Sequence, residues 1–450
     1  MREVIIVNGG KPLFGKVKPI PNKNAILTLL PASILTSKTV VYKNVPKSPD
    51  VLKMIEILKI LGAKIKVPKN WREDKGGTIN INTKTINSYK IDYGTGKKFR
   101  ASILLAGPLL ARFGKVFLPL PGGCSLGARS IATHIDNFKK MGAHIKYKKE
   151  GVLIEIKTPP KNVFIWQTET SVTATENLIL YLSGIKEKNT IFNAASEPHV
   201  TQLEKMLIKM GVSIRGVGSN KLQIQGNKTR NIKGTTVHID PDFVDITGLI
   251  IAASITKGKM TIVNSYKQEI MGGIIQILRK FGVNIKIRDK DIIIDGEKQE
   301  LNILKHLDEL PLAKKGLPKI VAQPWPGFPV DALPALVVLA CKSKGEVLIQ
   351  NWMYETGLHF ANILNSMGAN IFISDPQRII VKGPVTFKGE FVTAPGIIQA
   401  TYALFLAALS TKEKTVIEGA EILKRRYPNI FKLYRKLGAK IQVKKIKNAY

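Results

Sequence analysis

The chain has 450 residues, 44% of them hydrophobic, which suffices for two or three domains with a large core, and its two cysteines exclude a disulfide framework. No apolar stretch reaches the roughly 18 residues that a membrane-spanning helix needs, and residues 1–10 lack a cleavage-site pattern, so we expect a cytoplasmic protein. The formal net charge is +36, but the lysines are spread along almost every segment and aromatic residues make up only 7%. This distribution argues against a nucleic-acid partner and favours a general drift toward lysine, although a positive field would still attract small anionic substrates.

In chain order, apolar helices rich in small residues alternate with β-branched strands. A helix at 25–35 leads into a strand at 39–42, one at 101–111 into a strand at 116–118, and one at 403–409 into a strand at 415–417. Helices with apolar residues on every side are typical of buried positions. We therefore expect helices inside and sheets outside.

A second pattern occurs six times along the chain and predicts the architecture. Each copy is a helix that ends in a hydrophobic residue and a glycine, followed by a strand that contains isoleucine. Glycine can adopt the left-handed conformation that stops a helix, so the strand can begin at once. The glycines are Gly62, Gly142, Gly211, Gly282, Gly368 and Gly438.

Each repeat unit is predicted to be strand, helix, strand, helix, strand over about 70 to 85 residues, which is too long for a solenoid repeat. We expect two lobes of three units each. The first would combine residues 1–22 with 241–450, and the second would contain residues 23–240.

The most informative short segment is residues 119–129, which read PLPGGCSLGAR. A Pro-Gly-Gly run after a strand favours an exposed turn, with Cys124 at its tip and Arg129 five residues later. Neighbouring cations favour a thiolate, so Cys124 could serve as an acid or a nucleophile; the alternative is a loop cysteine without a role. Cys341 lies in an apolar run and is expected in the core.

Together, the repeat and the cysteine loop resemble the bacterial UDP-N-acetylglucosamine enolpyruvyl transferases over essentially the whole chain. The matching motifs are PNKNA at 21–25, FRAS at 99–102, PGGCSLGAR at 121–129, SVTAT at 171–175, EP at 197–198, PD at 241–242 and FPVD at 328–331. The resemblance implies a two-lobed inverted α/β barrel of six βαβαββ units. It also implies transfer of the enolpyruvyl group of phosphoenolpyruvate to the sugar 3-hydroxyl, the first committed step of peptidoglycan precursor synthesis, with no cofactor and no metal.

The family reaction supplies roles for the matched residues. Phosphoenolpyruvate is protonated at its methylene carbon, the sugar 3-hydroxyl attacks the adjacent carbon, and phosphate leaves from a tetrahedral intermediate. By resemblance, Cys124 is the proton donor and the target of the epoxide antibiotic fosfomycin, and Asp331 accepts the hydroxyl proton. The residues implied to bind phosphoenolpyruvate are Lys23, Asn24, Arg129 and Arg425. Those implied to bind the nucleotide sugar are Arg100, Arg129, Ser130, Ile131, Ala132, Thr133, Ser171, Val172, Asp331 and Met353.

Several of these residues have simpler alternatives. Lys23 could be one more surface lysine, and Arg425 could belong to a solvated charge run with its neighbours. Asp331 opens an apolar helix and could be a plain N-cap. We expect His134 to be structural.

This chain also departs from the family pattern. Arginine is usual at the positions of Phe243, Gly357 and Gln399, and an acid at that of Ile397; Thr173 replaces a glycine, Ala132 an aspartate and His199 a glutamate. These changes predict a site that has lost positive charge. They leave open a divergent paralogue with another nucleotide-linked acceptor, or a non-catalytic binding protein of the same fold.

Overall fold

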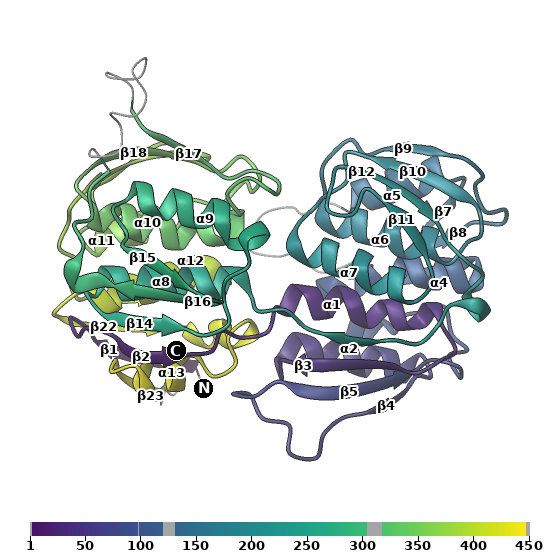
Figure 1. Cartoon of the computed structure of the whole chain (residues 1–450), viewed down its shortest axis with the longest axis horizontal. Coiled ribbons are helices and arrows are strands. Elements are labelled where there is room, and N and C mark those ends of the chain that lie inside the picture. Colours follow the sequence, from purple (N-terminus) through teal and green to yellow (C-terminus); the bar gives the residue numbers. More distant parts are fainter. Residues whose placement is uncertain (1, 98, 120–130, 304–316, 447–450) are drawn as a thin grey trace. The chain divides into compact units, whose positions relative to one another are not determined.

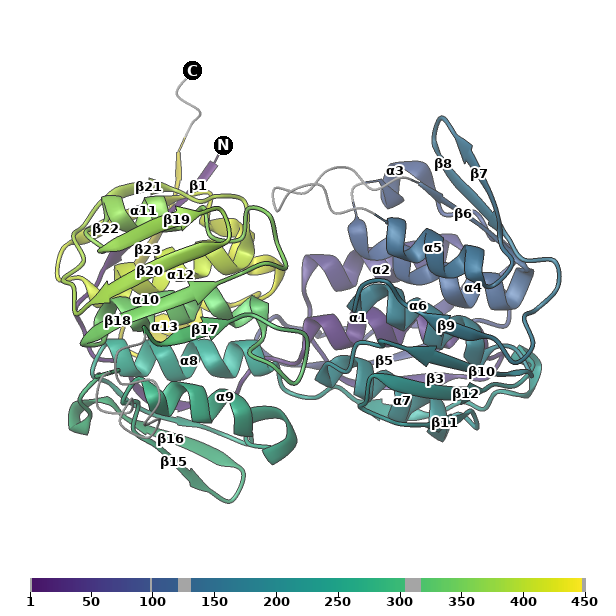
Figure 2. The ribbon, with the colours of Figure 1, turned by 90° about the horizontal axis from the view of Figure 1, so that it is seen from above.

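The computed structural model of the chain describes residues 2–97, 99–119, 131–303 and 317–446. The chain forms two compact units. The first consists of the N-terminal segment up to Ile20 and the chain from Pro241 onward, and the second of most of residues 21–240. Both units contain sheets on the outside and helices between them (Figures 1 and 2).

The described part of the first unit contains three four-stranded sheets, two of which need a strand from the N-terminus. Their strand orders are β21 (Phe391–Thr393), β22 (Lys414–Glu418), β1 (Arg2–Asn8), β23 (Lys440–Ile446); β15 (Ile285–Arg288), β16 (Asp291–Asp295), β14 (Lys259–Ile262), β2 (Phe14–Val17); and β17 (Lys319–Val321), β18 (Gly345–Gln350), β20 (Arg378–Gly383), β19 (Ile371–Asp375).

The described part of the second unit has the same plan. Its sheets are β13 (Thr236–His238), β3 (Val40–Val45), β5 (Gly77–Asn82), β4 (Lys64–Lys66); β11 (Ser213–Arg215), β12 (Lys221–Gln225), β10 (Lys188–Phe192), β9 (Phe164–Trp166); and β6 (Lys115–Pro119), β8 (Gly151–Glu155), β7 (His144–Lys148). In each four-stranded sheet one parallel pair is followed by two antiparallel pairings. In the three-stranded sheet the parallel partner is reduced to a bridge between Lys90 and Phe117.

Three largely buried helices lie inside each unit, as the sequence predicted. They are α8 (Phe243–Ile255), α10 (Leu333–Lys342) and α12 (Ile398–Ser410) in the first unit, and α1 (Lys23–Ala32), α4 (Ala106–Phe113) and α6 (Val172–Ser183) in the second. The expected helix at 25–35 is divided into α1 and the 3₁₀ turn η1 (Ser33–Leu35), and that at 101–111 into η2 (Arg100–Leu105) and α4. Within the described residues, no helix has the length and apolar character needed to span a bilayer.

The six glycine stops are confirmed. The helices before them are α2 (Pro49–Ile60), α5 (Ala132–Lys140), α7 (Pro198–Lys209), α9 (Gln268–Lys280), α11 (Ala361–Ser366) and α13 (Ile430–Lys436). Each of the six glycines has a positive φ, between 82° and 107°. The remaining short helical segments in the described part of the chain are α3 (Tyr93–Gly96), η3 (Thr229–Asn231), η4 (Gly296–Lys298), η7 (Val330–Ala332) and η8 (Ala420–Arg425). The predicted inverted α/β barrel of six repeat units is therefore the fold of the chain.

Candidate active site

Three of the predicted site residues, Cys124, Arg129 and Ser130, lie outside the described residues. The described chain stops at the end of β6 and resumes at Ile131, just before α5. Ile131 and Thr133 are half-buried and Ala132 is exposed. The Thr133 hydroxyl donates a hydrogen bond to Oε2 of Glu169 at 2.9 Å.

Lys23 is buried at the start of α1, which excludes the surface-lysine alternative. Asn22 caps this helix, since its Oδ1 accepts the N–H of Asn24 at 2.9 Å and that of Ala25 at 3.2 Å. The Lys23 ammonium lies 2.7 Å from Oδ2 of Asp50, in the first turn of α2, and both side chains are about one-tenth exposed. The sequence gives no signal that Asp50 pairs with Lys23, because a carboxylate in the first turn of a helix is favourable without a partner.

Other residues implied to bind the nucleotide sugar stand at the starts of helical segments in the same unit. Arg100 is half-buried and opens η2, and Ser171 and Val172 are half-buried at the N-terminus of α6. Ser171 makes no side-chain cap hydrogen bond. In the first unit, Met353 is half-buried and its backbone N–H donates to Oδ1 of Asn351 at 3.2 Å.

His134 is a structural residue, as expected. Gly107 donates its N–H to Oδ1 of Asn177 at 2.7 Å, so the Asn177 amide nitrogen faces Nδ1 of His134, at 3.0 Å. Nδ1 must then accept, and Nε2 carries the proton and donates to the Thr173 hydroxyl at 3.0 Å. Burial, and then the nearby positive charge of Arg100, lower the pKa of His134 to about 3, so the ring is neutral. Thr173, where the resemblance implies a glycine, contributes its hydroxyl to this buried network.

Glu176 is a buried carboxyl group that no motif of the sequence marks. It lies near His199, where the resemblance implies a glutamate. Glu176 in α6 accepts a hydrogen bond from the Thr28 hydroxyl at 2.7 Å, and Nε2 of His199 lies 3.7 Å from the same oxygen. Burial raises the pKa of Glu176 to about 8; the nearby Glu197 adds to the shift and the Thr28 bond opposes it. No sequence signal marks Glu176, because its position in an apolar helix becomes unusual only when the helix is known to be buried on all sides.

In the first unit, Asp331 belongs to a buried ion cluster. Nη1 of Arg426 lies 2.9 Å from Oδ2 of Asp331, and Nε2 of Gln399 donates to Oδ1 at 2.8 Å. The same guanidinium grips Asp242 with two hydrogen bonds of 2.9 Å each. The N-cap alternative for Asp331 is wrong: Asp331 lies inside η7, and neither η7 nor the following α10 has a side-chain cap hydrogen bond.

Arg425 and Arg426 are adjacent but differ in environment. Arg425, at the end of η8, is exposed, whereas Arg426 is 3% exposed. Burial by itself would lower the pKa of Arg426, but the nearby negative charges of Asp242 and Asp331 help to raise it well above its usual value, so the guanidinium is charged. In the sequence, Arg426 is one of the charged neighbours of Arg425 and resembles part of the same charge run. The aromatic residue that follows it, Tyr427, is the sequence signal that this segment approaches the core, and Tyr427 is buried.

The structure explains the residues found at the three positions where the resemblance implies arginine. Phe243 is buried against Trp325, with ring centroids 5.6 Å apart. Gly357 has no room for a side chain, since a Cβ there would lie 2.2 Å from Nδ2 of buried Asn351. Gln399 binds Asp331. The prediction of lost positive charge is therefore incomplete, because Arg426 supplies a buried cation next to Asp331.

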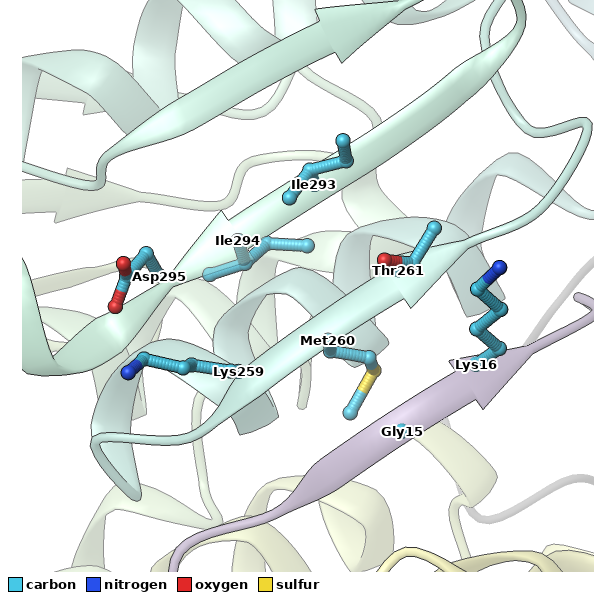
Figure 3. Close-up of a pocket in the computed structure, with 8 residues that line it drawn as sticks. All are labelled: Gly15, Lys16, Lys259, Met260, Thr261, Ile293, Ile294 and Asp295. Carbon is cyan, nitrogen blue, oxygen red and sulfur yellow. The ribbon is translucent and has the colours of Figure 1, made fainter.

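A surface hollow of about 300 Å³ lies elsewhere in the first unit (Figure 3). Its lining comes from β2, β14 and β16: Gly15, Lys16, Lys259, Met260, Thr261, Ile293, Ile294 and Asp295. None of the predicted site residues lines it. It is therefore separate from the ion clusters described above.

Comparisons with known proteins agree with the fold and the repeat. The family model of EPSP synthase (3-phosphoshikimate 1-carboxyvinyltransferase) matches residues 7–432. The UDP-N-acetylglucosamine 1-carboxyvinyltransferase of Treponema denticola is 34% identical over 98% of this chain and 99% of its own length. The enzyme of the same name from Borreliella burgdorferi is 35% identical over 98% and 99%.

Solved structures extend the similarity of fold to more distant proteins. The enolpyruvyl transferase NikO from Streptomyces tendae superposes with a TM-score of 0.85 at 18% identity, covering 99% of this chain and 100% of that one. An EPSP synthase from Acinetobacter baumannii superposes with a TM-score of 0.73 at 19% identity, with the same coverage.

Proposed function

The chain belongs to the EPSP synthase family of carboxyvinyltransferases, and on this premise we propose that it transfers the enolpyruvyl group of phosphoenolpyruvate to the 3-hydroxyl of UDP-N-acetylglucosamine. The observation that carries the proposal is the identity of about one-third, over nearly the full length, to enzymes named for this acceptor. The reaction releases phosphate and begins the synthesis of peptidoglycan precursors. Because both substrates are intracellular metabolites, the proposed place of action is the cytoplasm.

The proposed chemistry divides the proton transfers between two residues. Cys124 gives its proton to the methylene carbon of phosphoenolpyruvate, and the sugar 3-hydroxyl bonds to the adjacent carbon while its proton passes to Asp331. Phosphate then leaves as a proton is lost from the former methylene carbon, which restores the enol double bond. The double contact of Asp331 with Arg426 and Gln399 supports this role, since a base acts only when it is ionised and correctly oriented.

Phosphoenolpyruvate carries a phosphate and a carboxylate, and fixed cations can stabilise both as charge moves during the reaction. We assign this task to Lys23, Asn24, Arg129 and Arg425. The contact of Lys23 with Asp50 supports the assignment of Lys23, because it holds the ammonium in a fixed position at the start of α1.

We assign the binding of the nucleotide sugar to residues at helix starts of the second unit and to Asp331 and Met353 of the first. Arg100, Ser171 and Val172 stand at such starts, where backbone N–H groups favour anions. The full set is Arg100, Arg129, Ser130, Ile131, Ala132, Thr133, Ser171, Val172, Asp331 and Met353.

The test is phosphate release from phosphoenolpyruvate across a panel of UDP-sugars and free nucleotides. We expect release with UDP-N-acetylglucosamine and its loss in both C124A and D331N, with C341A as the matched control that retains activity. Release with a different acceptor only would identify a divergent paralogue. Binding of UDP-N-acetylglucosamine without release would identify a non-catalytic binding protein. Nucleic acid is not a proposed partner, and a salt-dependent mobility shift with RNA or DNA would contradict this.

A further inference from the structure

Arg426 is the cation of the ion cluster that holds Asp331 in the first unit. Its guanidinium is 3% exposed and makes three hydrogen bonds, each 2.9 Å long, to two carboxylates. Asp242 accepts two of these bonds and Asp331 accepts one. A planar guanidinium can hold carboxylates in this forked arrangement, whereas an ammonium presents a single point of charge.

The two carboxylates connect Arg426 to the altered positions. Asp242 is the N-cap of α8, its Oδ1 accepting the N–H of Val244 at 2.9 Å, and it directly precedes Phe243. Asp331 accepts a hydrogen bond from the side-chain amide of Gln399, which lies in the first turn of α12. The guanidinium thus binds Asp242, which directly precedes Phe243. It also binds Asp331, which accepts a hydrogen bond from Gln399.

Neither altered position supplies a charge of its own. Phe243 packs against Trp325, and Gln399 is neutral. A third altered position, Gly357, could accept arginine only if buried Asn351 moved. Arg426, which directly follows η8, is a described cation that contacts Asp331.

We infer that Arg426 is a positioning residue that orients Asp331 for the proposed transfer of the hydroxyl proton. This rests on the proposed function. Arg426 anchors to Asp242 through two bonds and offers its third to Oδ2 of Asp331, while Gln399 fixes Oδ1. With both oxygens held, the carboxylate of Asp331 has a defined orientation toward the hydroxyl whose proton it accepts.

Removal of Arg426 alone would leave the buried carboxylate of Asp242 without its cation, a change that strongly destabilises a folded protein. The test therefore uses D242N/R426Q, in which the charge and its carboxylate partner are removed together and the asparagine can still cap α8. The D242N variant alone is the background. Thermal unfolding establishes that each variant is folded.

We expect kcat of D242N/R426Q to fall about 10- to 100-fold relative to D242N, the loss that follows a displacement of ~1 Å, with KM for phosphoenolpyruvate changed about threefold or less. Adding Q399R returns a cation to Asp331 and should recover about tenfold or more of kcat. The matched variant Q399M in the same background should recover nothing, because it offers Asp331 neither charge nor a donor.

An unchanged kcat in D242N/R426Q, equal recovery with Q399M, or no recovery with Q399R in a folded protein would overturn the inference. If D242N/R426Q loses its cooperative unfolding transition, R426K replaces it, with the same expected fall in kcat and recovery with Q399R. Absence of phosphate release from the wild-type protein is a different result, because it refutes the proposed function and with it any role of Arg426 in that reaction.

Discussion

At the scale of single residues, the two thiols of the chain differ in environment. Cys341 is fully buried in α10, and burial raises the pKa of its thiol to about 12, so it is protonated and shielded at neutral pH. We therefore predict that fosfomycin alkylates Cys124 and leaves Cys341 unmodified. Peptide mass spectrometry after incubation with fosfomycin and UDP-N-acetylglucosamine measures this. Modification of Cys341, or none of Cys124, would remove the support for a catalytic Cys124.

Buried carboxyl groups make the stability of the protein depend on pH. Burial raises the pKa of Glu176 to about 8 and those of Glu204 and Asp245 to about 7. A carboxyl group whose pKa is raised on folding stabilises the native state fully below its unfolded pKa, near 4.5 for Glu, and this contribution is lost as pH rises through the folded pKa.

We predict that E176Q becomes more stable relative to the wild-type protein as pH rises from 5 to 9, because glutamine stays neutral. Melting temperatures at pH 5, 7 and 9 measure the difference. E150Q is the matched control, since Glu150 is exposed. A difference between E176Q and the wild-type protein that does not change with pH would contradict the prediction.

At the scale of secondary-structure elements, the glycine that ends each repeat helix is required by its backbone conformation. Gly211 follows α7 with φ of 97°, and a Cβ added there would meet no atom within 4 Å. Gly273, inside α9, also has no atom near an added Cβ and has no positive φ. The two positions therefore separate backbone conformation from steric contact.

We predict opposite effects of alanine at these two positions. Gly211→Ala should reduce the free energy of unfolding by about 1–2 kcal/mol, because an L residue disfavours the left-handed region. Gly273→Ala should increase it by about 0.5–1 kcal/mol, because alanine favours a helix interior. Urea denaturation of both variants measures this. Equal effects would show that the stop does not depend on the left-handed conformation.

At the scale of the whole molecule, the chain path makes the two units unequal. The first unit needs two N-terminal strands: β1 lies between β22 and β23, and β2 pairs with β14. Described residues 23–240 contain three sheets of their own. We propose that the lobes predicted from the sequence, residues 23–240 and residues 1–22 with 241–450, are independent folding units.

We predict that residues 23–240 fold when expressed alone, whereas residues 241–450 do not. Because Arg2 pairs with Ile446 in antiparallel strands, a short linker from residue 450 to residue 1 can add residues 1–22 back, and this permuted fragment should fold. Circular dichroism and amide hydrogen exchange measure folding. A folded 241–450 fragment without the N-terminal strands would contradict the prediction.

The sequence by itself determined the repeat, the helix stops, the inner helices and the family. These features are local or periodic. A glycine after an amphipathic helix predicts a helix end, and an apolar segment rich in small residues predicts a buried helix, in both cases from a few neighbouring residues. Only the tertiary structure decided which partners Arg426 and Glu176 contact. Arg426 meets Asp242 and Asp331 across 184 and 95 residues, and Glu176 meets Thr28 across 148. Whether a charged residue is solvated or buried in a pair depends on such distant partners, which no local pattern encodes.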